Sequence, residues 1–219
     1  EIGVRLVGSE MCIRDSIRTV NGATSPGLWW QAFDGGSKAV VGTRTLSTEV
    51  IDLNSGTAER ELFSGTIPYP TVWEGHLLTG VHEDGLLQLI RTDGSEQRVW
   101  NTPLPGQEMT YSASFGDTVI VVSRTASATD GTSFVTLVDP ESGEKSLESE
   151  IDAAVNWSGT REGTTVYLTG WDGGVYAIES SGSMERVLDI DQRITSPPAV
   201  SDGDVVFGTA EAEVWSFPV

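Results

Sequence analysis

The chain has 219 residues, of which 13 are Lys or Arg and 32 are Asp or Glu, so its formal net charge at pH 7 is −19. Such a surface repels the phosphates of nucleic acids and of anionic membranes, whose binding relies on clustered Lys and Arg. No run approaches the roughly 18 apolar residues of a membrane-spanning helix. Composition therefore argues against nucleic acid as a partner and against membrane insertion of the visible chain, while the 38% hydrophobic content suffices for a sizeable core.

The first 16 residues, EIGVRLVGSEMCIRDS, are unlike the rest of the chain. Codons for Leu6 to Ser16 reproduce a transposase sequencing adapter, and the five residues before them fit its index region in the same frame. We interpret residues 1–16 as an adapter-derived artefact on a metagenomic fragment whose native N-terminus is missing. The alternative, a natural leader or the tail of a signal peptide, lacks an apolar run and a small-residue cleavage site. Cys12 lies in this segment, so residues 17–219 hold no thiol for a disulfide, a thiolate metal site or a nucleophile.

After residue 16, short runs rich in β-branched and aromatic residues alternate with glycine turns, and no long stretch has helical periodicity. Two turn markers recur along the chain with spacings of 38 to 49 residues. The first marker comprises Gly36, Gly75, Gly116, Gly163 and Gly203, and the second comprises Gly56, Gly94, Gly143 and Gly182. A repeated four-stranded unit of about 40 residues is typical of a β-propeller blade, whose faces are buried by neighbouring blades. We therefore predict an all-β fold, a partial β-propeller of four-stranded antiparallel blades.

Taken in chain order, residues 17–27 align without gaps to residues 188–198 and share the sequence Thr-Ser-Pro with them. We expect this segment to be the outer strand of a preceding blade and its link inward. The predicted blades that follow are 28–65, 66–106, 107–152 and 153–192, with three strands of a fifth blade at 193–219. The third blade is lengthened by a polar excursion, SRTASATDGTS, which we interpret as an expanded hairpin loop from Ser123 to Ser133.

These units resemble pyrroloquinoline-quinone-like (PQQ-like) propeller repeats. The segments ITSPPAVSDGDVVFGT, GGVYAIESSG and TDGSEQRVWNTPLPG carry the resemblance, which covers residues 17–219. It implies a ring of seven or eight blades, of which about four and a half are present here. The family's outer-strand aromatic is Trp100 in one blade, whereas the other blades have Leu62 or Phe63, Leu147 and Leu188.

Quinoprotein dehydrogenases of this family hold their cofactor under a vicinal disulfide, with calcium and a catalytic aspartate. None of these motifs can be placed in this sequence. We therefore expect no catalytic, cofactor-binding or metal-binding residues in the visible chain, and we expect no bound cofactor.

His76 and His82 lie at opposite ends of one predicted strand, with Glu83 and Asp84 beside the second. Six residues of extended chain separate the two imidazoles by about 20 Å, which is too far for them to bind one metal ion. We expect both to be surface histidines.

The Asp-Gly pairs and one Asn-x-Ser sequence could be taken for calcium-binding and glycosylation sites, but neither interpretation is favoured. The Asp-Gly sites at Asp34, Asp84, Asp172 and Asp202 lack the alternating carboxylates of a calcium loop and are predicted to be turn residues. Asn156-Trp157-Ser158 fits an N-glycosylation sequon, but its strand context favours a chance match.

Seven tryptophans raise the possibility of carbohydrate or quinone stacking. Six fall on predicted strands, where packing within and between blades accounts for them: Trp29, Trp30, Trp73, Trp100, Trp157 and Trp215. Trp171 falls at a hairpin turn and is the best exposed candidate.

We expect a non-catalytic, exported propeller that acts as a protein-interaction scaffold in the periplasm, at the cell surface or outside the cell. Its partner-binding residues and its protein partner are not identified by the sequence. Long loops on rigid scaffolds are often functional, so the loop from Ser123 to Ser133 is a candidate binding element, with a tolerated, flexible insertion as the equal alternative. Two alternatives remain: the ligand-sensing ectodomain of a membrane-anchored protein, and a fragment of a quinone-dependent oxidoreductase.

Overall fold

The computed structural model describes residues 27–33, 36–43, 47–64, 71–83, 86–92, 98–125, 131–156 and 158–219. Residues 1–26 are outside this set, so the interpretations of the adapter-like segment and of residues 17–27 are not addressed by it. Asp34, Asp84 and Trp157 are outside it as well.

The described residues form five antiparallel sheets, each built from strands that are consecutive in the chain. The first sheet contains β1 (Gly27–Phe33), β2 (Lys38–Thr43), β3 (Ser47–Asp52) and β4 (Thr57–Ser64). The second contains β5 (Thr71–Trp73), β6 (His76–Glu83), β7 (Leu86–Thr92) and β8 (Arg98–Pro103). The third contains β9 (Glu108–Phe115), β10 (Thr118–Arg124), β11 (Ser133–Val138) and β12 (Lys145–Ile151). The fourth contains β13 (Thr160–Glu162), β14 (Thr165–Thr169), β15 (Gly174–Glu179) and β16 (Met184–Asp189), and the fifth contains β17 (Ala199–Ser201), β18 (Asp204–Gly208) and β19 (Val214–Pro218).

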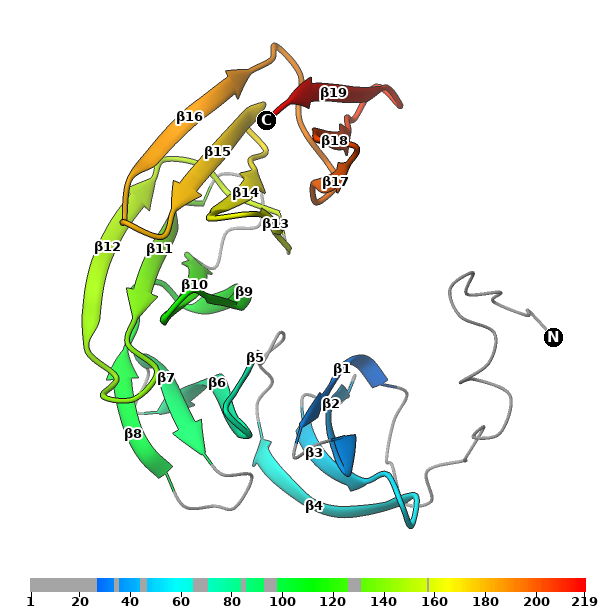
Figure 1. Ribbon diagram of the computed structural model, residues 1–219, viewed down its shortest axis with the longest axis vertical. Helices are drawn as coiled ribbons and strands as arrows, with labels where there is room; N and C mark the ends of the chain where they lie inside the picture. Colours follow the sequence, from blue (N-terminus) through cyan, green and yellow to red (C-terminus); the bar gives the residue numbers. More distant parts are fainter. Residues whose placement is uncertain are drawn as a thin grey trace, which may run out of the picture.

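The sheets follow one another along an open arc, with the first and fifth sheets at its two ends (Figure 1). The first strand of each sheet lies on the inner side of the arc, and the outer strands β4, β8, β12 and β16 lie on its outer side. Together, the four complete four-stranded sheets and the three-stranded fifth sheet form a partial β-propeller, which confirms the predicted fold class.

The hydrophobic cores lie between neighbouring sheets because side chains alternate across each strand. On β6, Leu77 belongs to a buried cluster shared with the first sheet, whereas the next residue, Leu78, belongs to a cluster shared with the third. On β14, Leu168 lies in the cluster between the third and fourth sheets, and Tyr167 lies in the cluster between the fourth and fifth. A middle strand is therefore apolar on both faces, and each sheet depends on its neighbours for burial.

Tight turns join the first two strands of the second to fifth blades. In the fifth sheet, Asp202 and Gly203 have positive φ angles of 54° and 81°, the pairing that a type I′ hairpin turn requires. Asp202 is therefore a turn residue, as its Asp-Gly context indicates. Glycine suits the second position because a left-handed backbone there costs it nothing.

The outer strand of one blade is also fastened to the next blade. Trp100 Nε1 on β8 donates a hydrogen bond to the carbonyl of Pro140, and Thr102 Oγ1 donates to the carbonyl of Gly143. A Cβ atom at Gly143 would lie 2.7 Å from Cδ2 of Trp100, so only glycine lets the indole approach this turn. One blade further along, Leu147 lies beside Gly182 in the corresponding turn. Leucine thus makes the inter-blade contact where the tryptophan of the resembled repeat is missing.

Candidate protein-interaction surface

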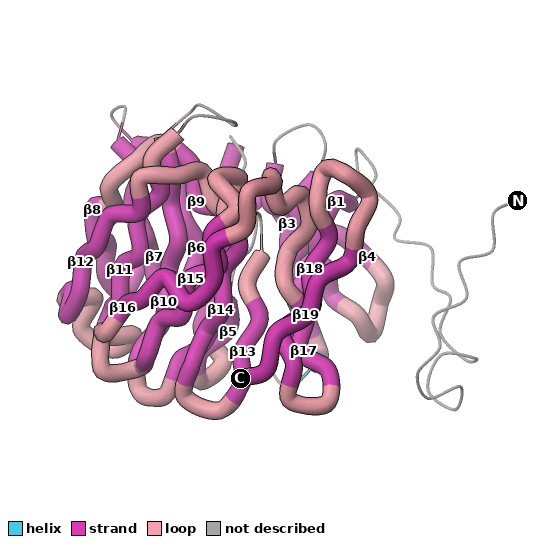
Figure 2. Tube along the Cα trace, turned by 90° about the horizontal axis from the view of Figure 1, so that it is seen from above, coloured by secondary structure: helices cyan, strands magenta, loops and turns pink. Residues whose placement is uncertain are grey.

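The strands of each blade run antiparallel, so the second and fourth strands end at the same end of the molecule. The connection from the second to the third strand and the link from the fourth strand to the next blade both start there. We call this end of the molecule the link end. Figure 2 shows the connecting loops gathered at the two ends of the strands.

Of the expanded loop predicted from Ser123 to Ser133, the structure describes the two ends, and residues 126–130 lie outside the described residues. Thr125 N–H donates to the carbonyl of Thr132 at 3.0 Å, and Thr132 N–H donates to Thr125 Oγ1 at 3.2 Å. These bonds hold the two ends of the connection together at the link end. In the fourth blade, the equivalent turn is closed by the Gly170 N–H donating to the Gly174 carbonyl, with only residues 171–173 between them.

The base of this loop is held rigidly. Arg124 is only 2% exposed, and its Nε and Nη2 atoms donate to one carboxylate oxygen of Glu108 at 3.0 and 2.9 Å. Glu108 is 34% exposed, so the pair places the buried guanidinium beside a carboxylate that reaches the surface. Ser123 Oγ donates to the carbonyl of Pro105, and Ser133 Oγ accepts from the N–H of Val155. Side-chain bonds thus fix both ends of this connection to neighbouring backbone.

A hydrogen-bonded cluster joins the fourth and fifth blades at the link end. The side-chain amide of Asn156 donates to Thr169 and to the carbonyls of Ile194 and Ser196, and its oxygen accepts from Trp171 Nε1 at 2.9 Å. Asn156 is 3% exposed. Its side chain thus satisfies buried backbone groups from two blades that water cannot reach.

Trp171 is part of this cluster. The Arg193 guanidinium stacks over the indole, with its carbon 4.1 Å from the ring centroid. One ring face is therefore covered by a cation–π contact, and the ring nitrogen is already bonded. The indole thus connects the fourth blade with the link into the fifth, and Arg193 occupies one of its two stacking faces.

A second polar cluster lies on the fourth blade around Asp172. Tyr176 Oη donates to Asp172 Oδ2 at 2.6 Å, and Arg186 bridges Asp172 and Asp189. Burial, together with the hydrogen bond to Asp172, raises the pKa of Tyr176 well above its usual value, so the phenol stays protonated and remains a donor. The Asp172 carboxylate also accepts from the Gly174 N–H, as expected of a turn residue.

The two histidines are not brought together. His76 begins β6, and its Nδ1 atom accepts a hydrogen bond from Arg91 Nη2 at 3.2 Å. His82 lies near the other end of the same strand, and its side chain is outside the described set. Among the described residues, no three His, Cys, Asp or Glu side chains are grouped so that they could hold a metal ion.

The sequence analysis missed the role of Asn156. Its side-chain nitrogen is buried and fully engaged, a position in which a glycan could not be accommodated. The four groups that it contacts come from residues 38 to 40 positions away or from the neighbouring strand, and no local pattern reports such contacts. Arg193 was missed for the same reason.

These features define a β-propeller segment whose blades are joined by side-chain hydrogen bonds at the link end. No family model and no curated protein matches the sequence. Among solved structures, the fold is similar to the computationally designed protein Ika8, with a TM-score of 0.66 and 14% identity over 87% of this chain and 57% of that one.

The fold is also similar to that of BamB from Moraxella catarrhalis. Its TM-score is 0.59, with 18% identity over 87% of this chain and 56% of BamB. The designed protein Ika4 has a TM-score of 0.53 and 14% identity over 70% of this chain and 91% of Ika4. The chain thus spans a little over half the length of Ika8 and of BamB. These similarities show the fold. In addition, no helix in the described part of the chain could cross a membrane.

Proposed function

We propose that this protein is a non-catalytic PQQ-like propeller scaffold that binds a protein partner outside the cytoplasm. The observation that supports the proposal is the lengthened connection between β10 and β11, whose two ends are joined by the Thr125–Thr132 bonds beside the half-buried Arg124–Glu108 ion pair. A loop of this kind on a rigid base presents variable residues without disturbing the core. The acidic surface favours a partner with a basic face, because complementary charge speeds encounter and suppresses wrong partners.

The test is affinity capture from the native host with the complete gene product. In the test variant, a short Gly-containing turn replaces residues 126–130, which leaves Thr125 and Thr132 in place to close the hairpin. Glu141→Ala, on an exposed turn at the opposite end of the same blade, is the matched control.

We expect the wild type and the control to capture the same partner and the loop variant to lose it. Capture of that partner by the loop variant would contradict the proposal. A saturable small-molecule ligand, with no reproducible protein partner for any form, would replace the scaffold by the ligand-sensing alternative.

A further inference from the structure

His76 lies on a tight turn where the second blade packs against the third. Glu74 and Gly75 have positive φ angles of 45° and 79°, the pairing of a type I′ turn, and His76 follows them as the first residue of β6. The third blade contacts this hairpin, since Ser114 Oγ on β9 donates to the carbonyl of Val72 on β5 at 3.3 Å. The side chain of His76 is half-buried at this position.

Arg91 on β7 connects this histidine to the third blade. Its Nη1 atom donates to the carbonyl of Pro140 at 2.8 Å, and its Nη2 atom donates to Nδ1 of His76 at 3.2 Å. Its Nε atom is buried and has no hydrogen-bond partner among the described residues, so the guanidinium relies on the acceptors at its terminal nitrogens. Trp100 Nε1 donates to the same Pro140 carbonyl at 3.1 Å. Two side chains of the second blade therefore hold one carbonyl of the third.

The contacts of His76 determine which ring nitrogen carries the proton. A guanidinium can only donate, so Nδ1 accepts from Arg91, and the single proton of the neutral ring is on Nε2. The carbonyl oxygen of Glu74 lies 3.3 Å from the same Nδ1 atom, and a carbonyl can only accept. In the neutral ring, Nδ1 is thus bonded to Arg91 and not to Glu74.

Protonation of the imidazole exchanges these two partners. Histidine is the side chain that ordinarily changes its charge between pH 5 and pH 8. A proton on Nδ1 creates a donor that the Glu74 carbonyl can accept, and it removes the acceptor that Arg91 uses. The ring also becomes positive beside the guanidinium, and like charges at hydrogen-bond distance repel each other. One nitrogen atom therefore has two alternative partners, and the pH selects between them.

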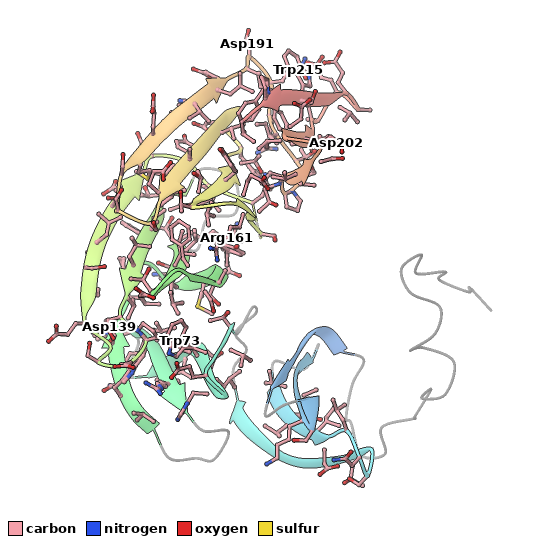
Figure 3. All side chains as sticks on the ribbon, in the orientation of Figure 1. Trp73, Asp139, Arg161, Asp191, Asp202 and Trp215 are labelled. Atoms are coloured by element: carbon pink, nitrogen blue, oxygen red, sulfur yellow. The ribbon has the colours of Figure 1, made fainter. Side chains whose placement is uncertain are left out.

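The charged residues in the three described turns at this end of the two blades are all acidic. They are Glu74 between β5 and β6, Asp117 between β9 and β10, and Asp139, Glu141 and Glu144 between β11 and β12. Figure 3 labels Asp139 beside the strands of the second blade. The N–H groups of Ser142 and Glu141 hold the pKa of the Asp139 carboxyl group below its usual value, and carboxyl groups ordinarily titrate below pH 5. Residues 93–97, which join β7 to β8, lie outside the described residues.

We propose that His76 and Arg91 form a pH-sensitive contact between the second and third blades. With a neutral imidazole, Arg91 is held by His76 and by the Pro140 carbonyl together. With a protonated imidazole, Nδ1 donates to Glu74, and Arg91 loses one of its acceptors and its fixed position on the β11–β12 turn. Trp100 shares the Pro140 carbonyl, so its indole N–H reports the change. The contact is tighter at pH 8 than at pH 5, whether or not the propeller binds a protein partner.

The test is a ¹⁵N NMR titration of the full chain from pH 8 to pH 5, which follows the Nε–H signal of Arg91, the indole N–H signal of Trp100 and the ring signals of His76. His76→Gln offers Arg91 a neutral acceptor at every pH. Arg91→Met keeps the length of the side chain and removes its donors. His82→Gln removes the other histidine of the chain and is the matched control.

In the wild type and in His82→Gln, we expect the Arg91 and Trp100 signals to shift with pH and to share the midpoint of the His76 ring. Both signals should stay constant in His76→Gln. In Arg91→Met, the His76 ring should still titrate, while the Trp100 signal no longer follows it. Constant Arg91 and Trp100 signals in the wild type while the His76 ring titrates would overturn the proposal. The same pH-dependent shifts in His76→Gln, or a Trp100 signal that still follows His76 in Arg91→Met, would overturn it as well.

Discussion

Asn156 shows how much one side chain contributes to the junction of two blades. It is buried, it donates to groups from both blades, and it accepts from Trp171. Replacement by alanine leaves the Trp171 N–H and several carbonyls unsatisfied, so we expect Asn156→Ala to lower the free energy of unfolding by about 2–3 kcal/mol. Urea denaturation measures this loss.

The control for this prediction is Asn101→Ala. Asn101 is exposed and bonds only to Gln88, so its loss should stay within about 0.5 kcal/mol. Equal losses for the two variants would show that the Asn156 cluster does not hold the blades together.

Asp139 gives a prediction with a defined pH dependence. The backbone N–H groups of Ser142 and Glu141 hold the pKa of its carboxyl group below the usual value. A carboxyl group whose pKa is lowered by folding adds stability above its unfolded pKa of about 3.9, and this stability is lost as the pH falls through the folded value. Urea midpoints at pH 7 and pH 3 should therefore differ more for the wild type than for Asp139→Asn. Parallel midpoints would contradict this assignment.

At the scale of elements, the contact between β8 and the turn after β11 couples neighbouring blades. Trp100→Ala removes the indole that lies against Gly143 and bonds to Pro140, and we expect a loss of about 2–4 kcal/mol, somewhat less than for a fully buried tryptophan. Val99→Ala, at an exposed position on the same strand, should have little effect.

A double-mutant cycle with Gly143→Ala tests the coupling directly. The new methyl group would clash with Trp100, and its φ of +78° strains any residue but glycine. Once Trp100 is alanine, the clash with the indole disappears, while the backbone strain and the 2.9 Å approach to Thr102 Oγ1 remain. We therefore expect non-additive losses, and simple additivity would show that the indole and the glycine are independent.

At the scale of the whole molecule, the arc of Figure 1 predicts an extended particle. A compact domain of this length has a radius of gyration of about 17 Å. Small-angle X-ray scattering of the monomer should give a clearly larger value and a distance distribution with a long tail. A value near that of a compact domain would indicate a closed ring.

The sequence was informative about the fold because a blade is a local object. The turn glycines and the alternation of Val, Leu and Tyr repeat with a fixed period, so the propeller class could be predicted without any long-range contact. The contacts between blades could not be predicted from the sequence. From the sequence, Asn156 looked like part of a sequon, although its side chain bonds to Ile194 and Ser196. Trp171 looked like an exposed stacking residue, although Arg193 lies over its ring. All three partners belong to the link into the next blade.

Affinity capture from the native host with the complete gene product tests the central claim most directly. If the scaffold binds its partner through the connection between β10 and β11, the wild type and Glu141→Ala capture the same protein, and the variant in which a short Gly-containing turn replaces residues 126–130 does not. Capture of that protein by the loop variant would contradict the account.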